Sequence, residues 1–280
     1  MTIRSRILPP GWYPGSKSEC LREIAQMVAG VQPLPPGTQV FGGIVPHAGW
    51  YFSGKLAARV FYLASLITQP QVVVVFGGHL GASSPPLLVT DDTWETPLGN
   101  LPLATEFYEP LSKRLELRKE YPEDNTIEIQ LPLVQHCFPK AKVLAVRAPH
   151  SPRAIDLGEA VVEVAQELKL SLLTFGSTDL THYGPNYGWA PKGLGPDAVQ
   201  WVKEVNDKKV VDLALKLDGE GMLKAAVQDK SACSAGGAVA AIAAAKKLGA
   251  TKTHLVDYYT SYDVMPNDSF VGYMGVVLAG

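Results

Sequence analysis

The chain has 280 residues, of which 46% are hydrophobic and 19% are charged, and its formal net charge is −2. These proportions are typical of a globular protein with a sizeable core and argue against disorder. Because the sequence has no block of lysine or arginine, nucleic-acid binding and a polybasic membrane patch have no electrostatic support. Apolar runs such as 72–76 are too short to span a bilayer, and prolines follow the N-terminal arginines where a signal peptide would be apolar. We therefore expect a cytoplasmic protein that binds neither nucleic acid nor membrane.

The first half of the chain predicts a strand–helix–strand unit with a histidine after each strand. The apolar strand Val40–Val45 ends at His47, and a helical pattern over 55–67 follows. The run 71–76 is apolar on both faces, as in a central parallel strand, and ends at His79. A right-handed parallel crossover places the ends of both strands at the same edge of the sheet. The two histidines are therefore expected to face each other.

The rest of the chain continues the alternation of helices and strands that is typical of α/β proteins. The further predicted elements are a helix over 16–29, a short strand over 87–90, a loop or hairpin over 94–99, a helix over 105–117, an amphipathic segment over 125–136, a strand over 141–148, a helix over 152–169, a strand over 171–175, helices over 199–217, 219–227 and 238–248, and strands over 254–258 and 271–278. No repeat or linker divides the sequence, so we expect one domain over residues 1–280.

Polar side chains also follow the predicted strand 171–175. Asp179 and His182 lie there in a run of serine, threonine and tyrosine, which indicates either a structural turn or an acid–base site. His47 or His79 alone could be a hydrogen-bonded turn residue. Two such turns at one edge of a sheet favour a functional site, because ligands of open α/β sheets bind outside the carboxyl ends of the strands.

Cys233 and Glu128 are further candidates. Cys233 precedes a predicted helix, whose N-terminus favours the thiolate, so it is a nucleophile, a soft metal ligand or a small buried thiol. Two imidazoles and a thiolate suit iron, copper or zinc. Glu128 lies between two isoleucines, either as a charge favoured by a helix dipole or as a carboxylate in a cleft. The sequence has no phosphate-binding loop, dinucleotide fingerprint or nucleophile elbow.

A set of short motifs, each weak alone, occurs in one order along nearly the whole chain: Val45-Pro46-His47-Ala48-Gly49-Trp50, Gly78-His79, Ile127-Glu128-Ile129-Gln130-Leu131-Pro132, Asp179-Leu180-Thr181-His182-Tyr183-Gly184, Ala232-Cys233 and Gly272-Tyr273. Together they resemble the MEMO family, also called AmmeMemoRadiSam system protein B. The resemblance implies a three-layer α/β/α fold with a mixed, largely parallel central sheet, similar to class III extradiol (LigB-type) dioxygenases.

The resemblance also implies a metal site. The dioxygenases hold non-haem iron(II) with two histidines and a glutamate, and in the MEMO family a cysteine replaces the glutamate. Carried over to this sequence, the implied metal ligands are His47, His79 and Cys233, with Asp179, His182 and Glu128 as cleft residues. His182 would donate or accept a proton. The sequence departs from the family pattern at Asn125-Thr126, where the family has His-Ser, and at Ser234, where it has glycine.

Two functions remain open from the sequence. The first is a metal-binding redox protein, an oxidoreductase that uses iron(II) or copper, with zinc as a further alternative because a thiolate is softer than a carboxylate. The second is a non-catalytic adaptor that retains the cleft and binds a peptide or a small molecule. The family name implies a radical-SAM system partner for either.

Overall fold

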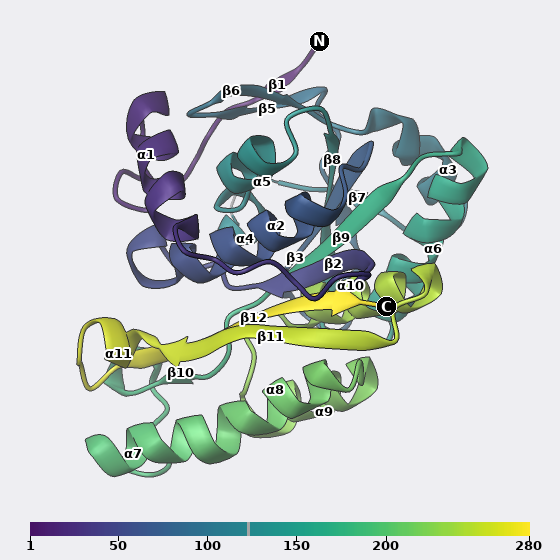
Figure 1. Cartoon of the computed structure of the whole chain (residues 1–280). Helices are drawn as coiled ribbons and strands as arrows, with labels where there is room; N and C mark the ends of the chain where they lie inside the picture. The colour runs from purple at the N-terminus through teal and green to yellow at the C-terminus, as the bar shows by residue number, and fades with distance from the viewer. Residues whose placement is uncertain (122–123) are drawn as a thin grey trace.

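The structure is a computed structural model that describes residues 1–121 and 124–280, and nine strands of this part form one mixed sheet (Figure 1). The strand order is β10-β12-β2-β9-β3-β8-β4-β7, and β11 pairs with β12. These strands are β2 (Val40–Val45), β3 (Val72–Leu80), β4 (Leu87–Leu88), β7 (Arg118–Lys119), β8 (Lys142–Pro149), β9 (Leu172–Ser177), β10 (His182–Tyr183), β11 (Lys252–Thr260) and β12 (Phe270–Ala279). The central strands β2, β9, β3 and β8 are parallel, whereas β12 runs antiparallel to β2 and β4 runs antiparallel to β8.

Helices cover both faces of the sheet, so the predicted α/β class with a mixed central sheet is confirmed. One face packs against α1 (Lys17–Val28), α2 (Lys55–Ile67) and α5 (Leu131–Cys137), with the single-turn α4 (Asn125–Glu128) beside β3. The other face packs against α3 (Tyr108–Ser112), α6 (Arg153–Leu168), α8 (Asp207–Leu215), α9 (Gly219–Asp229) and α10 (Ala235–Leu248). None of the helices in the described residues is long and apolar enough to cross a membrane.

The remaining elements are short and lie at the periphery. A small sheet joins β1 (Ile3–Arg4), β5 (Thr93–Thr96) and β6 (Gly99–Pro102), and β5 and β6 form the predicted hairpin. The other helical turns are Trp50–Gly54, Thr105–Phe107, Pro185–Tyr187, α7 (Pro196–Trp201), Val202–Asn206 and α11 (Ser261–Val264).

The strand–helix–strand unit places the two histidine turns at the same edge of the sheet, as predicted. Strands β2 and β3 are not direct neighbours, because β9 lies between them and pairs in parallel with both. Both strands therefore end at the same edge, and the rings of His47 and His79 lie 5.0 Å apart between centroids. The turn that carries Asp179 follows β9, so it lies between the two histidine turns.

Two predicted helices have different limits in the structure. The predicted helix over 105–117 is shorter, a 3₁₀ turn followed by α3, since Pro110 lacks an N–H group and fits only near the start of an α-helix. Helix α10 begins at Ala235, earlier than predicted, and includes Gly236 and Gly237. Glycine is a poor helix former, but a Cβ atom on Gly237 would lie 2.6 Å from the carbonyl oxygen of Phe76. The close approach of this helix to the strand ends therefore requires glycine there.

Candidate metal centre

Three side chains from separate turns meet at the carboxyl edge of the parallel strands. His47 follows β2, His79 lies at the end of β3, and Cys233 lies just before α10. A nitrogen of each imidazole and the sulfur of Cys233 lie within 4.8 Å of one another. The Sγ atom of Cys233 is 3.1 Å from Nε2 of His47. The structure thus brings together the three residues that the sequence predicts as metal ligands.

The backbone around His79 is shaped for this close approach. His79 adopts a left-handed conformation with φ of +58°, which is unfavourable for a residue with a side chain and is often found at functional sites. At Gly78, a Cβ atom would lie 2.0 Å from the Cβ atom of Ser234. The end of β3 therefore touches the loop that carries Cys233, and only glycine permits this contact.

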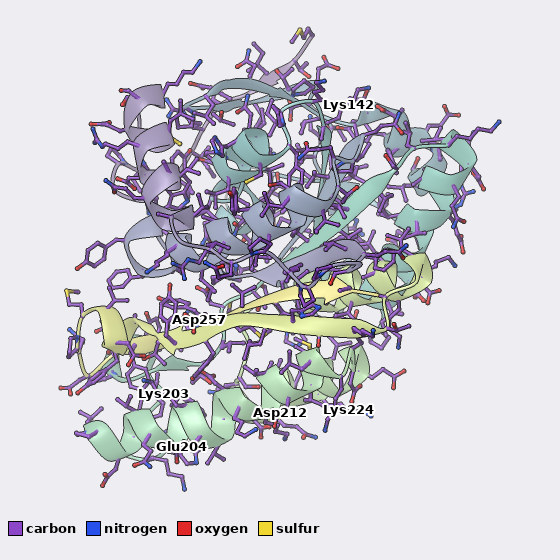
Figure 2. All side chains as sticks on the ribbon, viewed as in Figure 1. Lys142, Lys203, Glu204, Asp212, Lys224 and Asp257 are labelled. Carbon is purple, nitrogen blue, oxygen red and sulfur yellow. The ribbon has the colours of Figure 1, made fainter. Side chains whose placement is uncertain are left out.

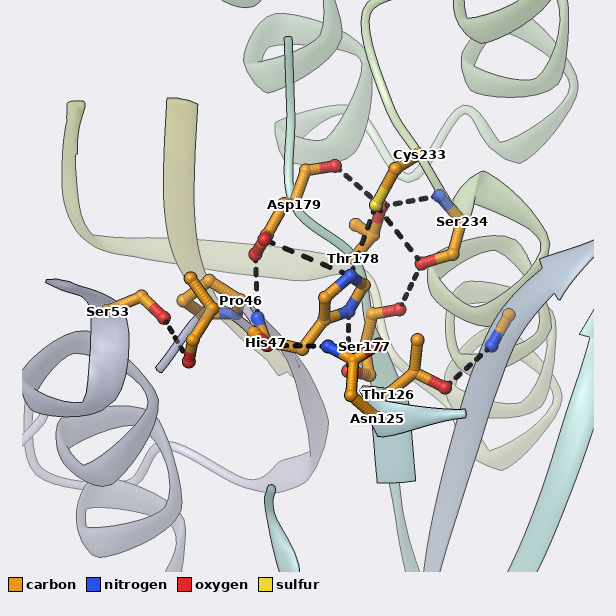
Figure 3. A network of polar contacts seen from close by, with 12 residues as sticks. Pro46, His47, Ser53, Asn125, Thr126, Ser177, Thr178, Asp179, Cys233 and Ser234 are labelled. Carbon is orange, nitrogen blue, oxygen red and sulfur yellow. Dashed lines mark hydrogen bonds and ion pairs between the residues drawn. The ribbon is translucent and has the colours of Figure 1, made fainter. Parts of the chain in front are cut away.

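Hydrogen bonds fix the orientation of His47 (Figure 3). Its backbone N–H donates to Oδ1 of Asp179 at 2.6 Å, and its carbonyl oxygen accepts from Nδ2 of Asn125 at 3.0 Å. Its ring Nδ1 lies 3.1 Å from the hydroxyl of Ser177. When Nδ1 carries the proton and donates to Ser177, Nε2 presents its lone pair toward Cys233 and is free to bind a metal ion.

His79 is oriented by a buried carboxylate. Its Nδ1 lies 2.8 Å from Oδ2 of Asp124, which leaves Nε2 for a metal ion, a carboxylate–histidine arrangement common at metal sites. Nη2 of Arg147 lies 3.5 Å from the same oxygen, and Nη1 of Arg147 lies 3.4 Å from Oε1 of Glu120. Glu120 in turn forms an ion pair with Arg4 of β1. We call Arg4, Glu120, Arg147 and Asp124 the ion-pair chain, and all four residues are buried.

The same contacts shift the pKa values of Cys233, His79 and Asp124. Burial opposes ionisation of Cys233, but His47, His79 and His182 outweigh it and lower the pKa of the thiol well below its usual value. Burial lowers the pKa of His79, but the hydrogen bonds with Asp124 and Cys233 reverse this effect and raise it to about 10. The pKa of Asp124 falls to about 2, since hydrogen bonds from His79 and Thr126 outweigh its burial. Cys233 is therefore a thiolate near neutral pH, the form that binds metals.

Asp179 and His182 line a cavity of about 450 Å³ together with His47 and His79, which we call the main cavity. Nδ1 of His182 lies 3.2 Å from the carbonyl oxygen of Leu180. A carbonyl oxygen only accepts, so Nδ1 is the nitrogen that carries a proton toward Leu180, and Nε2 is the nitrogen left for proton exchange. The geometry therefore allows His182 to exchange a proton with a molecule in the main cavity.

Glu128 lies apart from these residues. It is buried and does not line the main cavity. Its carboxylate accepts hydrogen bonds from the backbone N–H groups of Ile7 at 2.9 Å and Leu8 at 3.0 Å, and from the hydroxyl of Tyr13 at 2.8 Å. It therefore fastens the N-terminal segment 7–13, which covers a separate cavity of about 970 Å³ against α1. The role of a cleft residue that the family resemblance implies for Glu128 stays a prediction.

We expect Glu128→Gln to release the N-terminal segment. Glutamine presents an amide N–H₂ group to a site in which the backbone N–H groups of Ile7 and Leu8 can only donate, so at least one hydrogen bond is lost, a loss of about 1–3 kcal/mol. Hydrogen exchange followed by mass spectrometry should show faster exchange of peptides that contain residues 7 and 8, by about tenfold. Glu95→Gln is the matched control, because Glu95 binds Arg6, the residue just before this segment, through a more exposed ion pair. Equal exchange in both variants would contradict this role of Glu128.

The residues that support the candidate ligands were not predicted from the sequence. Asp124 and Ser177 bind the two imidazoles, and Arg147 holds Asp124. One signal was present for Arg147, since a charged residue stands inside the apolar strand pattern 141–148. Asn125, noted only as the loss of an imidazole, donates to the carbonyl oxygen of His47 and so supports the turn.

The residues present fit a metal ion. Metal–nitrogen and metal–sulfur bonds of about 2.0–2.3 Å require ligand atoms no more than roughly 4.5 Å apart, a separation similar to that found here. The donor set is two imidazoles and a thiolate, with a carboxylate or hydroxyl behind each imidazole. Such a set is selective for iron, copper or zinc over magnesium or calcium, which prefer oxygen ligands.

Comparison with known proteins gives consistent matches. A family model described as "Memo-like protein" matches residues 8–277. A MEMO1 family protein of Thermococcus onnurineus is 32% identical over 254 residues, covering 85% of this chain and 87% of that protein. A MEMO1 family protein of Methanosarcina acetivorans is 30% identical over 288 residues, covering 99% and 100%. The crystal structure of an uncharacterized protein from Escherichia coli K12 aligns with 79% of this chain and 91% of its own, at 13% identity and a TM-score of 0.49.

Proposed function

The chain belongs to the Memo-like protein family, and from this premise we propose that it is a metal-dependent oxidoreductase that holds iron(II) or copper with His47, His79 and Cys233. An ion held there would supply one-electron redox chemistry at coordination positions that the three protein ligands leave open. The proposal concerns a small organic substrate that enters the main cavity.

One observation carries the proposal: two imidazoles and a thiolate converge beside a cavity that also contains a proton-transfer residue. The ligand atoms come from three turns far apart in the sequence and lie within 4.8 Å of one another. His182, with its free Nε2, lines the cavity beside His47 and His79. A purely structural metal site is closed by protein ligands, whereas this one borders an open space.

In the proposed reaction the protein side chains bind, orient and transfer protons. Nε2 of His182 accepts a proton from a substrate hydroxyl and returns it at a later step. Asp179 is buried and holds the backbone of His47, so it fixes the position of one of the residues that would hold the ion. Asn125 also lines the main cavity and holds the other side of the His47 turn.

Metal analysis of anaerobically purified protein tests the proposal. We expect the native protein to retain iron or copper in near-stoichiometric amount, and His47→Ala to lose more than tenfold in affinity, because removal of one of three ligands leaves two. His136→Ala is the matched control, since His136 is exposed on α5 and lies outside the site. Equal and negligible metal in all three proteins would refute a metal-dependent function, and stoichiometric zinc would refute the redox function.

A non-catalytic adaptor is the second candidate function, in which the main cavity receives a peptide, for instance from a radical-SAM partner. Two exposed apolar side chains at the cavity, Tyr187 and Met265, favour it, because such residues are common at binding surfaces. Oxygen consumption in the presence of catechols, lost in His47→Ala, would support the oxidoreductase. Peptide binding that survives the loss of both His47 and Cys233 would support the adaptor.

A further inference from the structure

A second cavity meets the metal centre on the side of Cys233. This side cavity has a volume of about 480 Å³ and includes Cys233 in its wall, whereas His47 and His79 line the main cavity. His182 and Tyr187 line both cavities, and their rings pack edge to face at 4.8 Å between centroids. His182 and Tyr187 therefore stand between the two cavities, and a molecule in the side cavity lies beside Cys233.

The side cavity combines an apolar surface with nitrogen donors. Its apolar part consists of Leu180, Trp189, Ala226, Val227 and Ala232, beside Tyr187. Its charged or titratable groups are Lys230, His150, His182, Tyr187 and Cys233, whose thiolate a bound metal ion would neutralise, and no carboxylate is found among the described lining residues. Nε2 of His150 is shielded from solvent and has no hydrogen-bond partner in the described part of the chain. This composition suits a ligand that has a flat apolar body and a negatively charged group.

Lys230 is the residue that gives the side cavity its positive charge. It follows the last residue of α9 as the C-cap, in a left-handed conformation with φ of +50°. Its ammonium group lies 6.0 Å from the ring centre of Trp189, which also lines the cavity. Among the described residues no carboxylate forms an ion pair with Lys230, although other lysines nearby, such as Lys208 and Lys209, are paired. The ammonium group is therefore available to an anion in the side cavity.

We propose that the side cavity is a subsite for the carboxylate of a small planar organic anion, with Lys230 as the charged partner and Trp189 and Tyr187 against its apolar body. The inference rests on the proposed function and names the substrate class for it, since the anion would be part of the molecule that reacts at the metal centre. A charge-assisted hydrogen bond gives the carboxylate its preference over a neutral amide of the same shape.

Binding of benzoate and benzamide to the zinc-loaded protein, followed by ligand NMR titration, tests the subsite. Zinc is diamagnetic and takes no part in redox chemistry, so the result does not depend on turnover. We expect Lys230→Met to weaken benzoate binding by about five- to tenfold and to leave benzamide binding unchanged. The methionine side chain has most of the length of lysine and experiences the same strain in the left-handed backbone conformation of residue 230. The shape of the side cavity is therefore maintained.

Lys224→Met is the matched control, because Lys224 is an exposed lysine of the same helix that does not line the side cavity (Figure 2). It should bind both probes like the native protein. Equal loss of benzoate binding in the two variants, or none in either, would overturn the subsite. Benzoate binding that disappears without zinc and is insensitive to Lys230→Met would show direct ligation of the ion and would also overturn it. Metal content of each variant separates these outcomes from a failure of the metal centre itself.

Discussion

Replacing Arg147 with methionine is expected to lower the free energy of unfolding by about 3–5 kcal/mol and to weaken metal binding roughly 10–100-fold. Arg147 stands at the centre of the ion-pair chain, where it contacts both Glu120 and Asp124, and all three residues are buried. Its removal leaves the carboxylates of Glu120 and Asp124 with fewer partners in a low-dielectric environment. A buried charge without a full set of partners is strongly destabilising. Urea unfolding of the metal-free protein measures the first effect, and chelator competition measures the second.

The expected loss of metal affinity has a separate structural cause. Nε of Arg147 donates to the carbonyl oxygen of Gly78 at 3.0 Å, so the arginine holds both the backbone before His79 and the carboxylate that orients its ring. Arg153→Met is the matched control, because Arg153 is exposed at the start of α6. Arg147→Lys should recover part of the stability but little of the affinity, because lysine lacks the planar fork that makes both contacts. Native metal affinity in Arg147→Met would contradict the positioning role.

Much of the fold and two of the three candidate ligands, His47 and His79, could be predicted from the sequence because each rests on a local pattern. The strand before His47 and the strand before His79 are continuous apolar runs, and the handedness of the crossover places their ends together without knowledge of any contact. Cys233 needed the family resemblance, because its loop returns to the strand ends only after several helices. No periodicity in the sequence encodes the contact between Gly78 and Ser234 that brings it there.

The supporting residues could not be predicted because their partners lie far away in the chain. Arg4 lies in the short strand β1 and Glu120 directly follows the short strand β7, so their link to Arg147 forms only when β1 and β7 take their positions in the fold. Glu128 illustrates the converse. Its position between Ile127 and Ile129 indicates burial. The direction of its carboxylate depends on a proline-rich segment that lies more than a hundred residues earlier in the chain and has no periodic pattern.

Asp207 is expected to make the stability of the protein fall as the pH rises from about 4 to about 7. This carboxyl group is fully buried, and burial raises its pKa from 3.8 to about 7, against the opposing effect of hydrogen bonds from Thr181 and Tyr258. A raised pKa means that the folded state binds the proton more tightly than the unfolded state. The contribution of this proton to the free energy of unfolding is complete at pH values below the pKa of Asp207 in the unfolded state. It is lost as the pH rises through the pKa of Asp207 in the folded state. A difference of about three pKa units between the folded and unfolded states corresponds to roughly 4 kcal/mol in the free energy of unfolding.

Asp207→Asn should remove this part of the pH dependence, because an amide stays neutral and still accepts from Thr181 while donating to the hydroxyl of Tyr258. The measurement is the difference in unfolding free energy between pH 4.5 and pH 7.5, in the native protein and in the variant. Asp212→Asn is the control, since Asp212 is a half-buried residue of the same helix, with 46% of its side chain exposed (Figure 2). The same pH slope in all three proteins would contradict the assignment.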